Sequence, residues 1–273
     1  MRLTISLFLG IILAACGQHS DDTHEAPGAA HEATEAVATS DEPAVSIYEA
    51  AVASEARSEA DRARDAGRKP ARVLEFIGIG QDMTVLDMFS GGGYYSEIMA
   101  SVVGDGGKVI AHSNEAYLQF VGEEFNNRYA ENRLPNVEIL MAENNELALD
   151  AESLDAVMLV LSYHDLFNSS PEQGWPLIDI PGFLAELYKG LNPGGLVGIV
   201  DHYAEAGAST DSGNTVHRID PAIIIADMEA AGFDLLAESD MLRNPDDDLS
   251  KSVFDPGIRG NTDRFVMRFC KPE

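Results

Sequence analysis

This chain of 273 residues has few cysteines and few basic residues. Its two cysteines, Cys16 and Cys270, provide no disulfide framework of the kind that holds small secreted domains together. Lys and Arg number 18 against 46 Asp and Glu, which gives a formal net charge of -28. A surface this acidic repels nucleic acid and anionic lipid, so neither is an expected partner.

The apolar run at residues 3–15 is too short to span a membrane and has the length of a signal-peptide core. It ends in Leu13-Ala14-Ala15-Cys16, which resembles the lipobox of bacterial lipoproteins, where the cysteine is acylated and becomes the new N-terminus. We therefore expect residues 1–16 to be a signal peptide with lipidation at Cys16. An ordinary signal peptide with a chance cysteine is the alternative. Gly17 does not resemble an inner-membrane retention signal, so we expect an exported protein anchored by lipid to the outer membrane and facing the periplasm.

Residues 17–45 contain acids, Ala, Thr and Ser but no Lys or Arg, a composition that predicts a disordered tether. Residues 46–273 have the length of one α/β domain with an N-terminal helical extension. Helices are predicted at 47–67, 70–77, 93–102, 115–125, 179–190 and 220–231, and strands at 84–88, 108–112, 137–141, 154–161, 195–201, 233–239 and 264–270. This alternation predicts a parallel, doubly wound sheet with right-handed crossovers.

The segment from Val85 to Glu97 predicts a buried strand that ends near Asp87, turns through Gly91, Gly92 and Gly93, and opens a helix. Such a turn presents backbone N–H groups to an adenosine-bearing cofactor. A nicotinamide fingerprint requires a third glycine where Ser96 stands, which argues against a nucleotide-dependent oxidoreductase. The Gly-Lys-Ser/Thr of a phosphate-binding loop is absent from this turn as well.

The acid directly before the glycines and the later turn Asn192-Pro193-Gly194-Gly195 together resemble class I S-adenosylmethionine-dependent methyltransferases. This resemblance implies S-adenosylmethionine as cofactor and a three-layer, Rossmann-like α/β fold. Its seven-stranded sheet is mostly parallel, with one antiparallel C-terminal strand. Further motifs resemble a group of predicted, little-characterised bacterial methyltransferases, namely DAGRKP at 65–70, YHD at 163–165, VDH at 200–202, HRID at 217–220 and SVFDPGIRG at 252–260.

Ligands of such a sheet lie beyond the carboxyl ends of the strands. The expected cofactor-binding residues are Asp87, Ser90, Gly91, Gly93, Tyr95, Asn114, Glu115, Glu143 and Asn144. The chain departs from the superfamily pattern at two places. Phe89 stands at the first loop glycine, and Ser113 or Asn114 falls where an acid usually accepts both ribose hydroxyls.

The resemblance also places the fourth and fifth strands side by side, so His164-Asp165 and Asp201-His202 should face each other near the sulfonium of the cofactor. The predicted catalytic residues are Tyr163, His164, Asp165, His202 and His217, with a histidine as general base. Arg218 suits a carboxylate or phosphate on the substrate, or it pairs with Asp220 on the surface. We predict no metal site, because the spacing of Asp165, Asp201 and His202 alone does not support one.

Two functions remain open from the sequence. One is methyl transfer from S-adenosylmethionine to an unknown small-molecule, lipid or protein acceptor by an exported protein that meets the membrane only through its lipid anchor. The other is a non-enzymatic ligand-binding module on a methyltransferase fold. The motifs favour the first, and the predicted export favours the second, because the cofactor is a cytoplasmic molecule.

Overall fold

The computed structural model describes residues 45–171 and 174–273. The predicted signal peptide, Cys16 and the predicted tether up to residue 44 lie outside the described residues. No helix in the described part is both long and apolar enough to cross a membrane.

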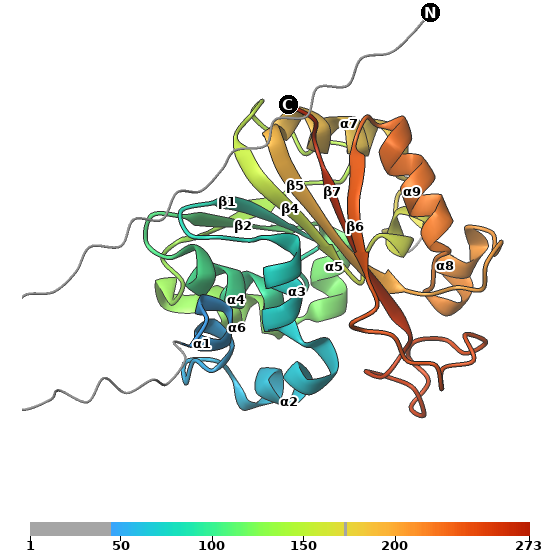
Figure 1. Ribbon diagram of the computed structural model, residues 1–273, viewed down its shortest axis with the longest axis horizontal. Helices are drawn as coiled ribbons and strands as arrows, with labels where there is room; N and C mark the ends of the chain where they lie inside the picture. Colours follow the sequence, from blue (N-terminus) through green and yellow to red (C-terminus); the bar gives the residue numbers. More distant parts are fainter. Residues whose placement is uncertain (1–44, 172–173) are drawn as a thin grey trace, which may run out of the picture. The chain divides into compact units, whose positions relative to one another are not determined.

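A seven-stranded sheet forms the centre of the described domain (Figure 1). Its strands are β1 (Thr84–Met88), β2 (Lys108–Ser113), β3 (Val137–Met141), β4 (Leu154–Val160), β5 (Leu191–His202), β6 (Asp234–Ser239) and β7 (Arg264–Cys270). Their order is β3-β2-β1-β4-β5-β7-β6, and β7 runs antiparallel to both β5 and β6. The predicted mostly parallel sheet with one antiparallel C-terminal strand is confirmed.

Helices cover both faces of this sheet, which makes three layers (Figure 1). The helices are α1 (Ile47–Val52), α2 (Glu59–Arg68), α3 (Pro70–Ile77), α4 (Tyr94–Val103), α5 (Glu115–Val121), α6 (Glu123–Tyr129), α7 (Ile180–Gly190), α8 (Asp211–Val216) and α9 (Pro221–Ala230). Short 3-10 turns follow α6 (η1, Ala130–Asn132) and β4 (η2, His164–Phe167). Helices α1, α3 and α4 pack on one face, while α7 and α9 pack on the other.

Two predicted helices are each divided in the structure. The helix predicted at 47–67 is wrong as a single element, because α1 ends at Val52 and Ser58 caps a new helix by accepting from the backbone N–H of Asp61. The helix predicted at 115–125 is broken at Gly122, whose φ of 59° ends α5. Helix α8 was not predicted, since its residues carry no apolar periodicity.

The core fills both sides of the sheet. On one side, buried residues of α3 and α4 such as Leu74, Ile77 and Ile98 pack on the strands, and on the other side Phe183 of α7 and Met228 of α9 do so. Helix α3 approaches β5 at Gly198, where a Cβ would lie 2.8 Å from Ile77 Cγ1. The packed core holds the strands in parallel register, with Met88 beside Leu159 and Leu159 beside Ile199, so β1, β4 and β5 end at one edge.

Candidate active site

The glycine loop joins β1 to α4 at this edge. Its backbone turns through positive φ at Phe89 (51°), Gly91 (56°) and Gly93 (76°). The loop also packs closely on α6, since a Cβ on Gly92 would lie 2.5 Å from Glu124 Oε2. Glycine is thus required here both by the turn and by the neighbouring helix.

Phe89 occupies a left-handed backbone position that normally favours glycine. Phe89 is 4% exposed, and its ring packs against Tyr117, with 4.8 Å between ring centroids, and edge-on against His112 at 5.5 Å. The Phe89 side chain is therefore turned largely into the aromatic core, with part of it at the cavity wall.

A cavity of about 440 Å³ opens beside the glycine loop. Its lining comprises Arg64, Arg68, Phe89, Ser90, Gly91, Gly92, Tyr94, Tyr117, Phe120, Val121, Val160, Leu161, His164, Asp165, Asn168, Trp175, His202, His217, Val253 and Phe254. Its volume falls in the range that small-molecule sites occupy in proteins, roughly 300–1,000 Å³. The cavity lies at the carboxyl ends of β1, β4 and β5, as expected for the ligand site of an open α/β sheet.

His164 is held in place by Asp201, whose side chain is fully buried. The Asp201 carboxylate accepts the backbone N–H of His164 at 2.9 Å through Oδ2 and the ring Nδ1–H at 2.8 Å through Oδ1. The second ring nitrogen, Nε2, lies 3.4 Å from Oδ1 of Asp165. His164 thus stands between two carboxylates, and its ring orientation is fixed by one of them.

These carboxylates control the charge of His164. Burial by itself would lower the pKa of His164, but Asp201 and Asp165 outweigh it and raise that pKa to about 9. The pKa of Asp165 is lowered, because His164, His217 and the Tyr117 hydroxyl, which donates to Asp165 at 2.5 Å, together outweigh its burial. At neutral pH the two residues form an imidazolium–carboxylate pair.

The two other predicted histidines also reach the cavity. Burial, followed by the positive charges of His164 and nearby arginines, holds the pKa of His202 well below its usual range, so this ring is neutral. Its Nδ1 lies 2.7 Å from the Thr262 hydroxyl. His217 Nδ1 lies 3.7 Å from Asp165 Oδ1, and its ring meets the edge of Phe254. The structure thus brings His164, Asp165, His202 and His217 together.

Three of these side chains lie close enough together to bind one metal ion. One ligand atom each from His164, Asp165 and His217 lies within 4.8 Å of the others. The metal set weighed from the sequence differs, since it contained Asp201 and His202 in place of His164 and His217. Asp201 instead orients His164 from behind, an arrangement found both in catalytic histidines and in metal-binding ones.

The structure contradicts two of the predicted roles. Tyr163 is fully buried and lies outside the cavity lining, with its hydroxyl 3.3 Å from Asp227 Oδ2 in α9, so it cannot position the acceptor. Arg218 is also fully buried and pairs with Asp247 at 2.9 Å, so it neither binds substrate nor pairs with Asp220. In both cases the side chain faces the protein interior, a direction that position along the chain does not specify.

The predicted cofactor residues divide at the glycine loop. Ser90 and Gly91 line the cavity. Asp87 lies behind the loop, 2% exposed, and accepts from the Ser96 hydroxyl at 2.5 Å. Burial outweighs this hydrogen bond and raises the pKa of Asp87 to about 7. Gly93 caps α4 and Tyr95 is in the core, so both shape the loop from outside the cavity lining.

The residues predicted to hold the adenosine half lie outside the cavity lining. Asn114 caps α5, and its amide donates to Asn144 Oδ1 at 2.8 Å. Glu115 is exposed, and Glu143 is half-buried. The end of β2 instead carries His112, whose Nδ1 accepts from the Phe89 N–H and whose Nε2 lies 3.0 Å from the Ala142 carbonyl oxygen. A ring that ties three strand ends together occupies this edge in place of a ribose-binding acid.

The cavity also has walls that sequence reasoning missed. Tyr117 and Trp175 form an aromatic wall, with ring centroids 5.4 Å apart, and Arg64 and Arg68 contribute positive charge. A signal for Arg68 existed, since it belongs to the motif at residues 65–70. Tyr117 and Trp175 had no such signal, because aromatic residues in helices and loops are most often core residues.

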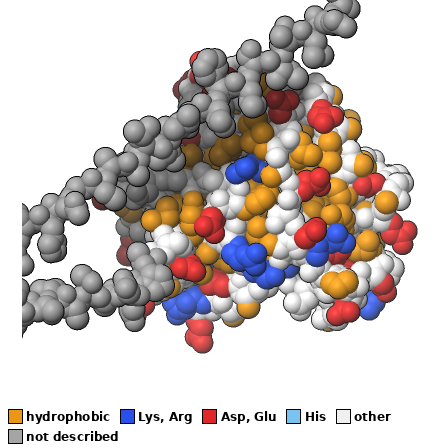
Figure 2. Space-filling model, in the orientation of Figure 1, with side chains coloured by type: hydrophobic (Ala, Val, Ile, Leu, Met, Phe, Trp, Pro, Cys, Tyr) orange, Lys and Arg blue, Asp and Glu red, His pale blue; other side chains and the backbone are white. Residues whose placement is uncertain are grey.

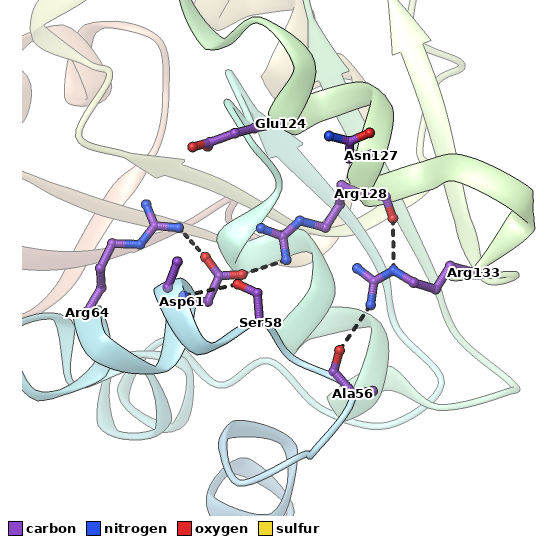
Figure 3. Close-up of a pocket in the computed structure, with 9 residues that line it drawn as sticks. Ala56, Ser58, Asp61, Arg64, Glu124, Asn127, Arg128 and Arg133 are labelled. Atoms are coloured by element: carbon purple, nitrogen blue, oxygen red, sulfur yellow. Dashed lines mark hydrogen bonds and ion pairs between the residues drawn. The ribbon is translucent and has the colours of Figure 1, made fainter.

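Helix α2 is fastened to the glycine loop by Arg128 of α6. The Arg128 guanidinium pairs with Asp61 at 2.6 Å and with Glu97, and it donates to the Gly92 carbonyl oxygen at 2.7 Å. Figure 3 shows Asp61 between Arg64 and Arg128, in a separate pocket lined by α2 and α6. The arginines of this separate pocket, Arg64, Arg128 and Arg133, are therefore each paired with a carboxylate of the protein.

Comparison with known proteins agrees with this architecture. The family profile of protein-L-isoaspartate(D-aspartate) O-methyltransferase (PCMT) matches residues 56–146, which include the glycine loop. No curated protein matches the chain significantly. A solved S-adenosylmethionine-dependent methyltransferase from Aquifex aeolicus superposes with a TM-score of 0.53 at 20% identity, covering 76% of this chain and 98% of that one.

Two further structures extend the comparison. A chain of the Haloferax volcanii complex that contains the methyltransferase activator Trm112 gives a TM-score of 0.52 at 16% identity, over 80% of this chain and 99% of that one. The [4+2]-cyclase SpnF gives 0.50 at 14% identity, over 78% and 81%. This chain has the fold of the S-adenosylmethionine-dependent methyltransferases. S-adenosylmethionine is the cofactor that this likeness implies.

Proposed function

We propose that this protein transfers a methyl group from S-adenosylmethionine to a hydroxyl or amine of an acceptor. The observation that carries the proposal is His164, a buried histidine oriented by Asp201 in the cavity beside the glycine loop. Asp201 orients the ring through Nδ1, and Nε2 lies 3.4 Å from the Asp165 carboxylate, which lines the same cavity. A buried histidine held in this way can act as a general base toward a bound acceptor.

The cavity fits this cofactor at the glycine loop and fits it less well at the ribose. Backbone groups of Ser90, Gly91 and Gly92 line one side, and the rings of Tyr117 and Trp175 provide an apolar wall for a base to stack against. No carboxylate at the end of β2 replaces the missing ribose acid, since the buried His112 occupies that end. We expect weaker cofactor affinity than in a site with that acid.

The cofactor supplies an electrophilic methyl group on a sulfonium. His164 supplies the proton acceptor, because the acceptor hydroxyl or amine must lose its proton as it is methylated. Asp201 stabilises the imidazolium that results. With a pKa of about 9, His164 is protonated at neutral pH, so only a fraction on the order of one hundredth is in the base form before ligands bind.

Binding of S-adenosylmethionine tests the proposal directly. Calorimetric titration of the full chain in mild detergent with S-adenosylmethionine and S-adenosylhomocysteine should give saturable binding. Absence of binding at millimolar ligand would overturn the proposal. His164→Ala should leave both affinities unchanged and, once an acceptor is identified, should lower turnover by about 10²- to 10⁴-fold.

The second candidate is a binding module that has kept the fold for another ligand. Phe89 at the first loop glycine and the missing ribose acid favour it. The fold alone does not decide between the two, since SpnF is a [4+2]-cyclase. Binding of a ligand in the cavity without affinity for S-adenosylhomocysteine would support this candidate.

We further propose that the protein is exported and anchored by lipid at Cys16, with residues 17–45 as a tether and the outer membrane as its location. The apolar run at residues 3–15, the lipobox-like ending and Gly17 support this proposal. The methyl acceptor, whether small molecule, lipid or protein, would then be met outside the cytoplasm.

A further inference from the structure

A second cavity of about 590 Å³ adjoins the first one. The two share Arg64, Arg68, Leu161, His202, Val253 and Phe254 as lining residues. Beyond this shared wall, the second cavity is bounded by Ala63, Ala66, Gly67, Arg259, Gly260, Asn261, Thr262 and Arg264. The motif at residues 65–70 therefore meets the motif at residues 252–260 around one space, although they stand far apart in the sequence.

The charge of this second cavity is opposite to that of the chain. Its lining contains Arg64, Arg68, Arg259 and Arg264, and no carboxylate from the described residues. The whole chain has 46 acidic and only 18 basic residues. On the face that Figure 2 shows, Lys and Arg side chains gather mostly below its centre, and carboxylates are scattered over the whole face. A cavity whose charged lining residues are all arginines is thus a local exception in this acidic chain. Its positive charge favours an anionic ligand.

Among these arginines, Arg264 lacks an ion-pair partner within the described residues. The other buried arginines of the described chain each pair with a carboxylate: Arg57 with Asp65, Arg128 with Asp61 and Arg218 with Asp247. Arg264 is 6% exposed, and among the described residues its guanidinium donates only to carbonyl oxygens, those of Thr262 at 3.2 Å and Gly67 at 2.8 Å. Burying a guanidinium without a counter-charge is costly, so a ligand anion would stabilise it.

Arg68, the last residue of α2, is another arginine without an ion-pair partner in the described part of the chain. Within residues 45–171 and 174–273 its guanidinium has neither a hydrogen-bond acceptor nor an ion-pair partner, and it lies 4.7 Å above the Tyr94 ring. Burial lowers the pKa of Arg68, and burial together with the charge of Arg68 lowers that of Arg264. The two guanidinium groups repel each other across the cavity.

The position of this cavity suits an acceptor better than a cofactor. Of the two cavities, the first is lined by the glycine loop and the second by Arg259 and Arg264. His202 lines both, and its ring centroid lies 5.9 Å from that of His164. A molecule whose acidic end lies between the arginines would extend past His202 toward His164 and the glycine loop.

We propose that the second cavity binds the acidic group, a carboxylate or a phosphate, of the methyl acceptor through Arg68 and Arg264, with Arg259 at its exposed rim. Planar guanidinium groups match both kinds of anion with paired hydrogen bonds. The assignment rests on the proposed methyl transfer for the identity of the bound molecule as an acceptor. The need for an anion rests on the arginines themselves.

The test is calorimetric titration of the full chain with inorganic phosphate and with acetate. Wild type should bind at least one of these saturably, and the stronger ligand indicates which acidic group the acceptor carries. Arg68→Gln and Arg259→Gln should each weaken that binding about tenfold, the effect of one lost charge-assisted hydrogen bond. Arg72→Gln is the matched control, since Arg72 is an exposed arginine of α3 outside both cavities.

Titration with S-adenosylhomocysteine separates this inference from the proposed function. Unchanged affinity in Arg259→Gln, together with weakened anion binding, supports an acceptor site. A comparable loss of S-adenosylhomocysteine affinity would assign the arginines to the cofactor and overturn the inference. The inference would also be overturned if Arg68→Gln and Arg259→Gln bound phosphate and acetate with the same affinities as wild type. Anion binding without any S-adenosylhomocysteine binding would instead overturn methyl transfer.

A fold control accompanies the arginine variants. Arg264, the first residue of β7, joins this strand to α2 through the Gly67 carbonyl oxygen, so its removal disturbs the structure as well as the charge. Arg68→Lys keeps the positive charge, and it should retain more anion affinity than Arg68→Gln. If both variants keep the unfolding temperature of wild type and bind the anion with the same affinity as each other, Arg68 does not contact the anion.

Discussion

Asp87 is a single residue whose burial has a measurable cost. Its carboxyl group accepts from Ser96 without an ion-pair partner among the described residues, and burial raises its pKa from 3.8 to about 7. The unfolded chain therefore releases this proton at lower pH than the folded chain. Folding stability should decrease as pH rises from about 4 to 7 and then level off.

Replacement of Asp87 by Asn should remove this dependence. We expect Asp87→Asn to be more stable than wild type at pH 8 by a few kcal/mol, and similar to wild type at pH 4. Urea unfolding across this pH range, without ligand, measures both. Equal stabilities of the two proteins at pH 8 would show that burial of the ionised Asp87 carboxylate does not destabilise the folded protein.

His164 predicts the pH dependence of the reaction. Because its pKa is raised to about 9, the base form becomes more abundant as pH increases through that value. With a suitable acceptor, kcat/KM should rise about tenfold per pH unit below 9 and then reach a plateau. Asp201→Asn removes one of the two carboxylates and should shift the rising limb to lower pH.

An independent measurement distinguishes the titration of His164 from effects of the substitution on folding. NMR titration of the His164 ring in wild type should show a midpoint near the kinetic one. A kinetic limb that stays in place in Asp201→Asn, or a His164 midpoint near its ordinary value, would contradict the assignment of His164 as the base.

Among the single residues of the site, those next to strand ends were the predictable ones. Ser90, His164, Asp165 and His202 lie at the cavity because a parallel sheet collects its strand ends at one edge. Tyr163 and Arg218 were mispredicted because adjacent residues can point to opposite sides of the backbone. Whether a long polar side chain finds its partner inside the protein depends on distant residues such as Asp247.

Among the elements, α2, α4 and α6 depend on one side chain, Arg128. Its guanidinium joins Asp61 of α2, Glu97 of α4 and the Gly92 carbonyl of the glycine loop. Arg128→Met leaves buried carboxylates with one cation fewer, so we expect a loss of about 3 kcal/mol in the free energy of unfolding.

Denaturant unfolding of Arg128→Met against Arg72→Met measures this effect. Arg72 is exposed and has no partner among the described residues, so Arg72→Met should remain within about 0.5 kcal/mol of wild type. Equal stabilities of the two variants would mean that the network of Arg128 contributes nothing beyond a surface ion pair.

Several strands were predicted more accurately than the long helices because short apolar runs in the sequence mark them. The strand predicted at 137–141 has the observed bounds, and so does the one at 264–270. Helices α1 and α2 were merged because a stretch rich in Ala, Glu and Arg continues through the break at Ser58. A cap residue inside such a stretch is visible in the sequence, but only tertiary contacts decide whether the helix stops there.

Across the whole domain, the sequence could not indicate which distant segments meet. Gly67 in the motif at residues 65–70 lies so close to Gly260 that a Cβ would be 3.1 Å from the Gly260 carbonyl oxygen. Arg264 then donates to the Gly67 carbonyl oxygen. Residues 259–264, which lead into the antiparallel β7, thus return to α2, and both segments line the second cavity together with His202.

The last prediction concerns the whole molecule in the cell. If Cys16 is acylated, the protein should partition into membranes and incorporate labelled palmitate. Cys16→Ser should abolish the label and move the protein to the soluble fraction. Cys270→Ser is the matched control, because Cys270 lies at the end of β7 within the folded domain, and it should change neither property. Palmitate label that persists in Cys16→Ser would contradict the anchor. Loss of the label alone, with the protein still in the membrane fraction, would indicate that another contact holds the protein there.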